Sequence, residues 1–136
     1  MERKTISKSA WIYIENNSVL SVRSVNRKKF YFPGGKPEPG ESRQEALIRE
    51  IKEELSVDLV SESIKFIGTF EAEADSHPQG IIVRMDCFTA KYTGSLRAAA
   101  EIEEIAWLTY QEKHKSSIVD QIIFEWLMKN QLIRKD

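Results

Sequence analysis

Three glutamates near the middle of the 136-residue chain have a spacing that could do chemistry. Glu50, Glu53 and Glu54 stand at positions i, i+3 and i+4, so in a helix their side chains share one side. On a helical wheel at about 100° per residue, Glu50 and Glu54 lie at the margin of an apolar stripe and Glu53 lies farther out. The pattern predicts carboxylates where the helix meets the body of the protein.

Clustered carboxylates of this kind favour a bound cation. Like charges one turn apart repel by a few tenths of a kcal/mol, and here they lie toward the negative end of the helix dipole. Carboxylate oxygens are preferred ligands of Mg²⁺ and Mn²⁺, and Mg²⁺ usually shares its shell with waters and substrate phosphates. The cluster therefore predicts a divalent metal and a phosphate-bearing small molecule. Taken alone, E-x-x-E-E is more often a solvated face, here with Arg49 and Lys52 as counter-charges.

The surrounding residues resemble a known family motif. They match the Nudix box, G-x5-E-x7-R-E-U-x-E-E-x-G-U with U a bulky aliphatic, at Gly35, Glu41, Arg49, Glu50, Ile51, Glu53, Glu54 and Val57. Ser56 stands where the family has glycine, which predicts a small stability penalty at the helix end and no lost ligand. Residues 32–35 and 101–108 are also similar to MutT-like Nudix hydrolases. The box spans residues 35–57 of a single expected domain, 1–136.

The resemblance implies roles for individual residues. Glu50 and Glu54 are expected as principal metal ligands, with Glu53 as ligand or general base and the Gly35 carbonyl completing the shell. Further expected catalytic residues are the orienting pair Glu41 and Arg49 and two alternative general bases, Glu101 and Glu104. The cofactor is expected to be Mg²⁺ or Mn²⁺.

Candidate substrate contacts come from flanking segments. A small basic patch contains Arg23, Arg27, Lys28 and Lys29, which suits a phosphate group rather than a polymer. Of these, Arg23 is assigned to the substrate phosphates, with Lys36 as a second candidate. Phe32 is a candidate to stack on a base, although core packing is an alternative role for the aromatic residues of this segment, and Arg84 is a candidate to line the pocket.

The predicted activity is that of a metal-dependent pyrophosphohydrolase. It would cleave a phosphoanhydride bond in a nucleoside diphosphate linked to another moiety, with nucleoside triphosphates or modified ones favoured. Two alternatives stay open: a non-catalytic nucleotide-sensing module and a small-diphosphate isomerase. Retention of all the motif glutamates favours the hydrolase.

Strands and helices must position these residues. Strand-like runs are expected at 10–14, 19–25, 29–32, 64–74, 80–92 and 105–108, with a turn at 75–79. A helix is predicted over 42–55, opened by a capping box of Ser42 and Glu45, and another over 117–132. Together with the resemblance, this order predicts an α/β fold. It is a Nudix-type α/β/α sandwich, with a mixed sheet flanked by the box helix and a C-terminal helix.

Composition narrows the function classes. A net charge of −1 argues against a nucleic-acid polymer as partner, because such binding needs a concentrated basic face. No stretch reaches the roughly 20 apolar residues of a membrane span, and no signal-peptide pattern opens the chain. The single cysteine, Cys87, is expected to be an inert buried thiol, and Trp107 and Trp126 are expected in the core. We therefore expect a cytoplasmic enzyme, as a monomer or homodimer, acting on a small nucleotide.

Overall fold

The computed structural model describes residues 4–74 and 80–136, so the predicted turn at 75–79 lies outside the described residues. Its larger sheet has the strand order β4-β1-β7-β6. The strands are β1 (Lys4–Trp11), β4 (Gly34–Gly35), β6 (Lys65–Glu73) and β7 (Ile81–Thr89). β1 runs parallel to β7, while the pairs β1–β4 and β6–β7 are antiparallel. The sheet is therefore mixed, as predicted.

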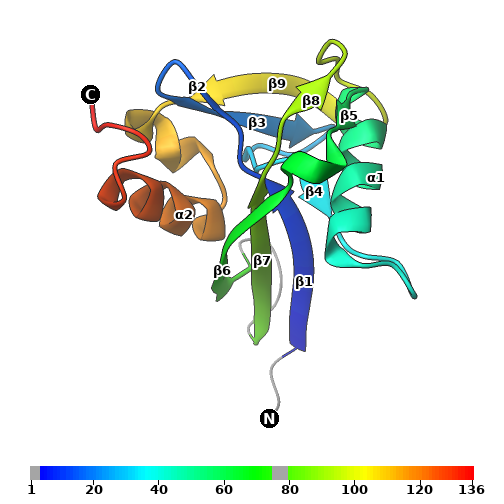
Figure 1. Ribbon diagram of the computed structural model, residues 1–136. Coiled ribbons are helices and arrows are strands. Elements are labelled where there is room, and N and C mark those ends of the chain that lie inside the picture. The colour runs from blue at the N-terminus through cyan, green and yellow to red at the C-terminus, as the bar shows by residue number, and fades with distance from the viewer. Residues whose placement is uncertain (1–3, 75–79) are drawn as a thin grey trace.

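A second sheet crosses above the first and has the order β2-β3-β9 (Figure 1). It consists of β2 (Ile14–Glu15), β3 (Ser18–Ser24) and β9 (Ile102–Leu108). A third, two-stranded sheet pairs β5 (Asp58–Leu59) with β8 (Tyr92–Thr93) in antiparallel orientation, and β5 contacts the helix that precedes it. The strand predicted at 29–32 is reduced to two isolated bridges, Val22 with Tyr31 and Phe30 with Ser116.

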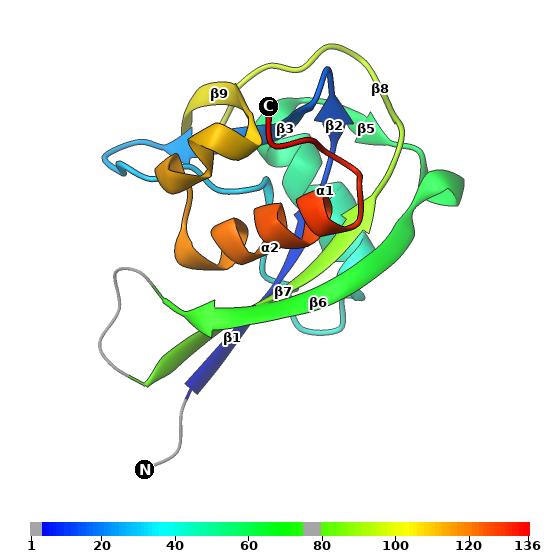
Figure 2. The ribbon, with the colours of Figure 1, turned by 90° about the vertical axis from the view of Figure 1, so that its left-hand side faces the viewer.

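Two α-helices flank the larger sheet. The helix α1 (Arg43–Leu55) lies on one side and α2 (Ile118–Lys129) on the other, and Figure 2 shows α2 passing over β6 and β7. Each helix covers its own apolar core, one centred on Leu47 and Ile51 and the other on Ile123 and Phe124. Two 3₁₀ helices, η1 (Ser61–Ser63) and η2 (Tyr110–Lys115), complete the described elements. None of the described helices is long and apolar enough to cross a bilayer.

Local sequence explains the bounds of α1. Ser42 is the N-cap: its side chain accepts a hydrogen bond from the Glu45 N–H, and the Glu45 carboxylate accepts one from the Ser42 N–H. The helix ends at Ser56, which adopts the left-handed conformation with φ 65°. Both features confirm the sequence-based expectations for this segment.

The predicted tryptophan environments are half right. Trp126 packs edge-on against Phe70 beside the core. Trp107, by contrast, is 37% exposed on β9. The buried positions of β9 are those at its two ends, Ile102 and Leu108, and Trp107 has the opposite parity to both. Cys87 is buried as expected, and burial raises the pKa of its thiol.

Candidate active site on the α1 helix

The site begins where the glycine pair of β4 touches α1. Glu54 belongs to the buried face of the helix and is 3% exposed. Its carboxylate accepts a hydrogen bond from the Gly34 N–H at 3.1 Å. Gly34 is in turn held in register with Ala10 of β1, so closely that a Cβ would clash with the Ser9 carbonyl. Gly34 thus brings its backbone N–H into contact with the buried carboxylate of Glu54.

Glu50 lies one turn before Glu54, against the second glycine. A Cβ on Gly35 would overlap the Glu50 carboxylate, so only glycine permits this approach. The Glu50 side chain is 17% exposed, and the Arg49 Nη1 donates to it at 2.7 Å. The carboxylate therefore has one side on Arg49 and another beside the Gly35 backbone.

Arg49 and Glu41 form the orienting pair that the motif predicts. Arg49 donates through Nε and Nη2 to both Glu41 oxygens, at 2.8 and 2.9 Å, and Nη2 also donates to the Lys36 carbonyl at 3.2 Å. Such a two-point contact fixes the plane of both groups. The hydrogen bonds from Arg49 and from the Glu38 N–H lower the pKa of Glu41 to about 2. The hydrogen bonds to Glu41 and Glu50 raise the pKa of Arg49. The pair ties the loop before the helix to its middle.

Six acidic residues line one cavity of about 920 Å³, and three of them act on one another through their charges: Glu50, Glu54 and Glu101. Glu101 is placed there because its carbonyl accepts from the Val25 N–H and because the Ala99 N–H donates to the Glu54 carbonyl. Burial raises the pKa of Glu54 to about 8, although the Gly34 N–H lowers it, and Glu50 and Glu101 raise it further. Burial also raises the pKa of Glu50. The cavity thus concentrates negative charge in a poorly solvated place.

The residues around this acidic cluster fit a divalent cation. In residues 4–74 and 80–136, no three His, Cys, Asp or Glu side chains lie together in a way that could hold a metal ion by themselves. Mg²⁺ needs none, because it commonly takes one or two carboxylates and fills its shell with water and phosphate. Glu50 and Glu54 match that requirement, because burial and the charges of neighbouring carboxylates raise the pKa of both and because the adjacent Gly35 has no Cβ.

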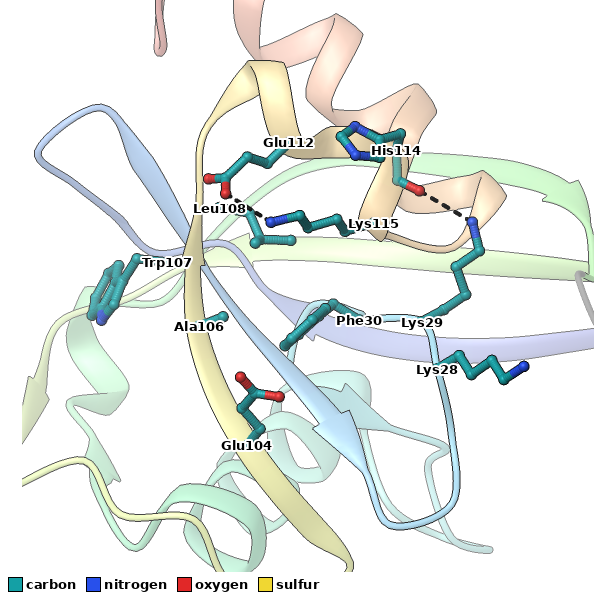
Figure 3. Close-up of a pocket in the computed structure, with 10 residues that line it drawn as sticks. All are labelled: Lys28, Lys29, Phe30, Glu104, Ala106, Trp107, Leu108, Glu112, His114 and Lys115. Atoms are coloured by element: carbon teal, nitrogen blue, oxygen red, sulfur yellow. Dashed lines mark hydrogen bonds and ion pairs between the residues drawn. The ribbon is translucent and has the colours of Figure 1, made fainter.

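Two predicted residues, Arg23 and Glu104, lie elsewhere. The Arg23 guanidinium contacts Glu103 at 3.2 Å and Glu104 at 3.1 Å, and it does not line the cavity. Glu104 lines a separate hollow of about 500 Å³ between β9 and the Phe30 segment, below η2 (Figure 3). The structure therefore does not bring Arg23 to the substrate phosphates. Of the two alternative bases, it brings only Glu101 to the motif glutamates.

Four further predicted residues also need correction or comment. The Phe32 ring is 1% exposed and packs on Phe124 at 5.3 Å between centroids, which supports its alternative role in core packing, although the residue also borders the cavity. Arg84 points away from the cavity, because its neighbours Val83 and Met85 line it from the same strand. Lys36 does line the cavity, while Glu53 is 52% exposed, outside the lining, and 3.4 Å from Arg49.

Sequence reasoning missed several cavity residues. Lys8 lines it from β1, and Tyr31 lines it with its hydroxyl 2.5 Å from that of Ser24. Burial raises the pKa of Tyr31 to about 12, so the phenol is neutral. Lys8 had a readable signal, since it shares strand parity with Ile6 and Ala10 and so is a polar residue at an inward position. The basic patch was read correctly in part: Arg27, Lys28 and Lys29 line the cavity.

Comparison with known proteins agrees with this geometry. The sequence profile of the NUDIX domain matches residues 5–127. The chain is similar to YvcI, an uncharacterized Nudix hydrolase of Bacillus subtilis, with 25% identity over 118 residues, covering 85% of this chain and 75% of that protein. It is 30% identical over 82 residues to the CTP pyrophosphohydrolase of Escherichia coli, covering 60% of this chain and 56% of that protein.

Solved structures show the same architecture. The MutT protein from Methanosarcina mazei superposes with a TM-score of 0.77 at 20% identity, covering 96% of this chain and 98% of the other. This likeness confirms the predicted α/β sandwich. Because the family profile matches most of the chain, the chain belongs to the NUDIX domain family and is a Nudix-type hydrolase acting on phosphorus-containing acid anhydrides.

Proposed function

We propose that the chain is a metal-dependent pyrophosphohydrolase of nucleoside diphosphates linked to another moiety, with nucleoside triphosphates or modified ones as the favoured substrates. One observation carries the proposal: Glu50, Glu54 and Glu101 share a cavity beside Gly35, while the adjacent Arg49 is held by Glu41. Partly desolvated carboxylates of this kind bind a hard cation and, through it, phosphate oxygens.

The metal would be Mg²⁺ or Mn²⁺, held by Glu50, Glu54 and the Gly35 carbonyl, with Glu53 approaching from the exposed side of the helix. When bound, such an ion polarises phosphoryl oxygens and lowers the pKa of water. The protein supplies the positioning. Arg49 fixes the Glu50 carboxylate at 2.7 Å, and the Gly34 N–H fixes that of Glu54 at 3.1 Å.

Within the same cavity, we assign Glu101 as general base, because its charge acts on both Glu50 and Glu54 and because neither Arg49 nor a backbone N–H engages its carboxylate among the described contacts. It would take a proton from the attacking water. The oxygen of that water bonds to phosphorus while the bridging P–O bond breaks, and the leaving phosphate retains the bonding electrons. The products are a monophosphate and a second phosphate product.

Other parts of the cavity suit the rest of a nucleotide. Arg27, Lys28 and Lys36 supply positive charge for phosphates, and Val83, Met85 and Val119 supply an apolar wall for a base or sugar. The printed name of the Escherichia coli relative, CTP pyrophosphohydrolase, supports a nucleoside triphosphate as the class of substrate to test first.

A nucleotide panel assayed with Mg²⁺ or Mn²⁺ tests the proposal. Both products should be identified by chromatography, and the Glu54→Gln variant should serve as the control, since the amide keeps the size and an acceptor for the Gly34 N–H. We expect turnover to fall by several orders of magnitude in that variant. Metal-independent hydrolysis, an active Glu54→Gln variant, or binding without cleavage across the panel would refute the proposal.

A further inference from the structure

A lysine on the first strand faces the same cavity as the motif glutamates. Lys8 is half-buried in β1 and lines the cavity, although the motif assigns it no role. Its neighbour Ser9 is paired with Gly35, so Lys8 lies one position along the strand from the expected metal site. A lysine side chain is long and flexible, with a compact charge at its end. Its ammonium group can therefore reach a group held beside Gly35.

The strand neighbours of Lys8 carry no compensating charge. Across the larger sheet it is in register with Met85 of β7, which is in register with Phe70 of β6, so both neighbours in its row are neutral. In the described parts of the chain its ammonium group forms no ion pair or side-chain hydrogen bond that the structure records. Its field does reach Glu54, whose pKa it lowers slightly. A half-buried cation of this kind is stabilised when an anion completes the site.

The position within the cavity decides which anion fits. Oxygens of the phosphate chain would lie next to Gly35, Glu50 and Glu54. Lys8 lies at the same end of the cavity, one position along β1 from the residue that pairs with Gly35. Of the apolar wall, Met85 is in register with Lys8, and Val83 lies two positions farther from Gly35 along β7. Lysine binds phosphate as a point charge without demanding a planar, two-point geometry. A phosphoryl oxygen therefore matches Lys8 better than the edge of a base.

We propose that Lys8 binds a phosphoryl oxygen of the substrate, so that the phosphate chain is held by β1 as well as by the glutamates of α1. The proposal deepens the proposed function and rests on it. It adds a substrate-binding residue outside the motif and requires that every good substrate present a phosphate at this strand. The contribution of Lys8 to binding affinity should then be the same whichever base the nucleotide carries.

Binding experiments test this without relying on turnover. Affinities of imidodiphosphate and of non-hydrolysable nucleoside triphosphate analogues should be measured by calorimetry with Mg²⁺, for the wild type and Lys8→Met. Lys4→Met is the matched control, because Lys4 lies on the same face of the same strand, outside the cavity lining. We expect Lys8→Met to weaken all these ligands by about 10- to 100-fold, Lys8→Arg to weaken them less, and Lys4→Met to change none.

Several outcomes would overturn the assignment. They are unchanged affinity in Lys8→Met, an equal loss in Lys4→Met, or a loss confined to one base, which would place Lys8 at the base instead. Lys8→Gln provides a second neutral variant if the methionine variant does not fold, as judged by its thermal unfolding. Wild-type protein that binds imidodiphosphate but hydrolyses no nucleotide would refute the proposed function while leaving the role of Lys8 tested.

Discussion

The departure of this chain from its family motif gives a quantitative prediction at Ser56. The residue has φ 65° and ψ 20°, and its N–H closes the helix by donating to the Lys52 carbonyl at 3.1 Å. A left-handed conformation costs a non-glycine residue about 1–2 kcal/mol, whereas glycine adopts it freely. Glycine, however, loses more conformational freedom on folding, roughly 0.5–1 kcal/mol. The Ser56 hydroxyl lies 3.4 Å from the Arg97 carbonyl, too long to contribute much.

Ser56→Gly should therefore stabilise the protein by roughly 0.5–1 kcal/mol, the difference between these opposing effects. For a domain of this size the melting temperature should rise by about 2–4 °C, measurable by calorimetry or urea unfolding. Ser56→Ala is the control, because it removes the hydroxyl but keeps the left-handed strain, and it should not stabilise. The reasoning would be refuted if both variants shifted stability equally, or if Ser56→Gly lowered it. Turnover of a cleaved nucleotide should stay within about twofold of wild type, since no assigned site residue changes.

Three other predictions concern the acidic cluster. Because burial raises the pKa of Glu54 from 4.5 to about 8, the folded state binds a proton more tightly than the unfolded chain. Its contribution to metal-free stability is fully present below pH 4.5 and is lost as pH rises toward 8. In urea unfolding of metal-free Glu54→Gln, the free energy of unfolding should not show this decrease with pH. A decrease equal to that of wild type would contradict the assignment. Arg49→Lys should lower kcat/KM by about 10- to 100-fold, because lysine cannot hold Glu41 and Glu50 together; unchanged kinetics would show that their orientation is immaterial. Glu101→Gln should lower kcat by about 10²- to 10⁴-fold while Glu104→Gln leaves it near wild type, and the reverse order in steady-state assays would assign the base to Glu104.

The helix that carries the motif could be predicted because its signals are local. The capping box joins residues three apart, and the apolar stripe of Leu47 and Ile51 repeats within one helix. The same stripe placed Glu54 at the boundary of the buried face, where the structure finds it. Such features depend little on the rest of the fold, which explains why sequence alone located this helix and its bounds.

The substrate-facing residues could not be predicted as well, because they depend on contacts distant in sequence. β7 alternates from Val83 to Cys87, which places Arg84 on the face opposite Val83 and Met85, but the local sequence could not show which of the two faces borders the cavity. Arg23 and Glu104 are 81 positions apart and meet only because β3 pairs with β9. For Phe32, burial was decided by α2, through Phe124. Sheet register and helix packing, rather than local propensity, therefore decided these outcomes.

The graded burial of the three motif glutamates also argues for distinct roles that the spacing alone could not separate. Glu54 is 3% exposed, while the side chains of Glu50 and Glu53 are 17% and 52% exposed. Water competes least with a ligand at the most buried carboxylate, yet burial also penalises its charge most when no cation is present. A divalent ion should therefore stabilise the charged form of Glu54 most and that of Glu53 least. Its effect on Glu50 should be intermediate, because Arg49 already compensates that charge. Glu54 is buried at a cost in free energy and is held in place by the Gly34 N–H, and both features favour a role in binding a cation.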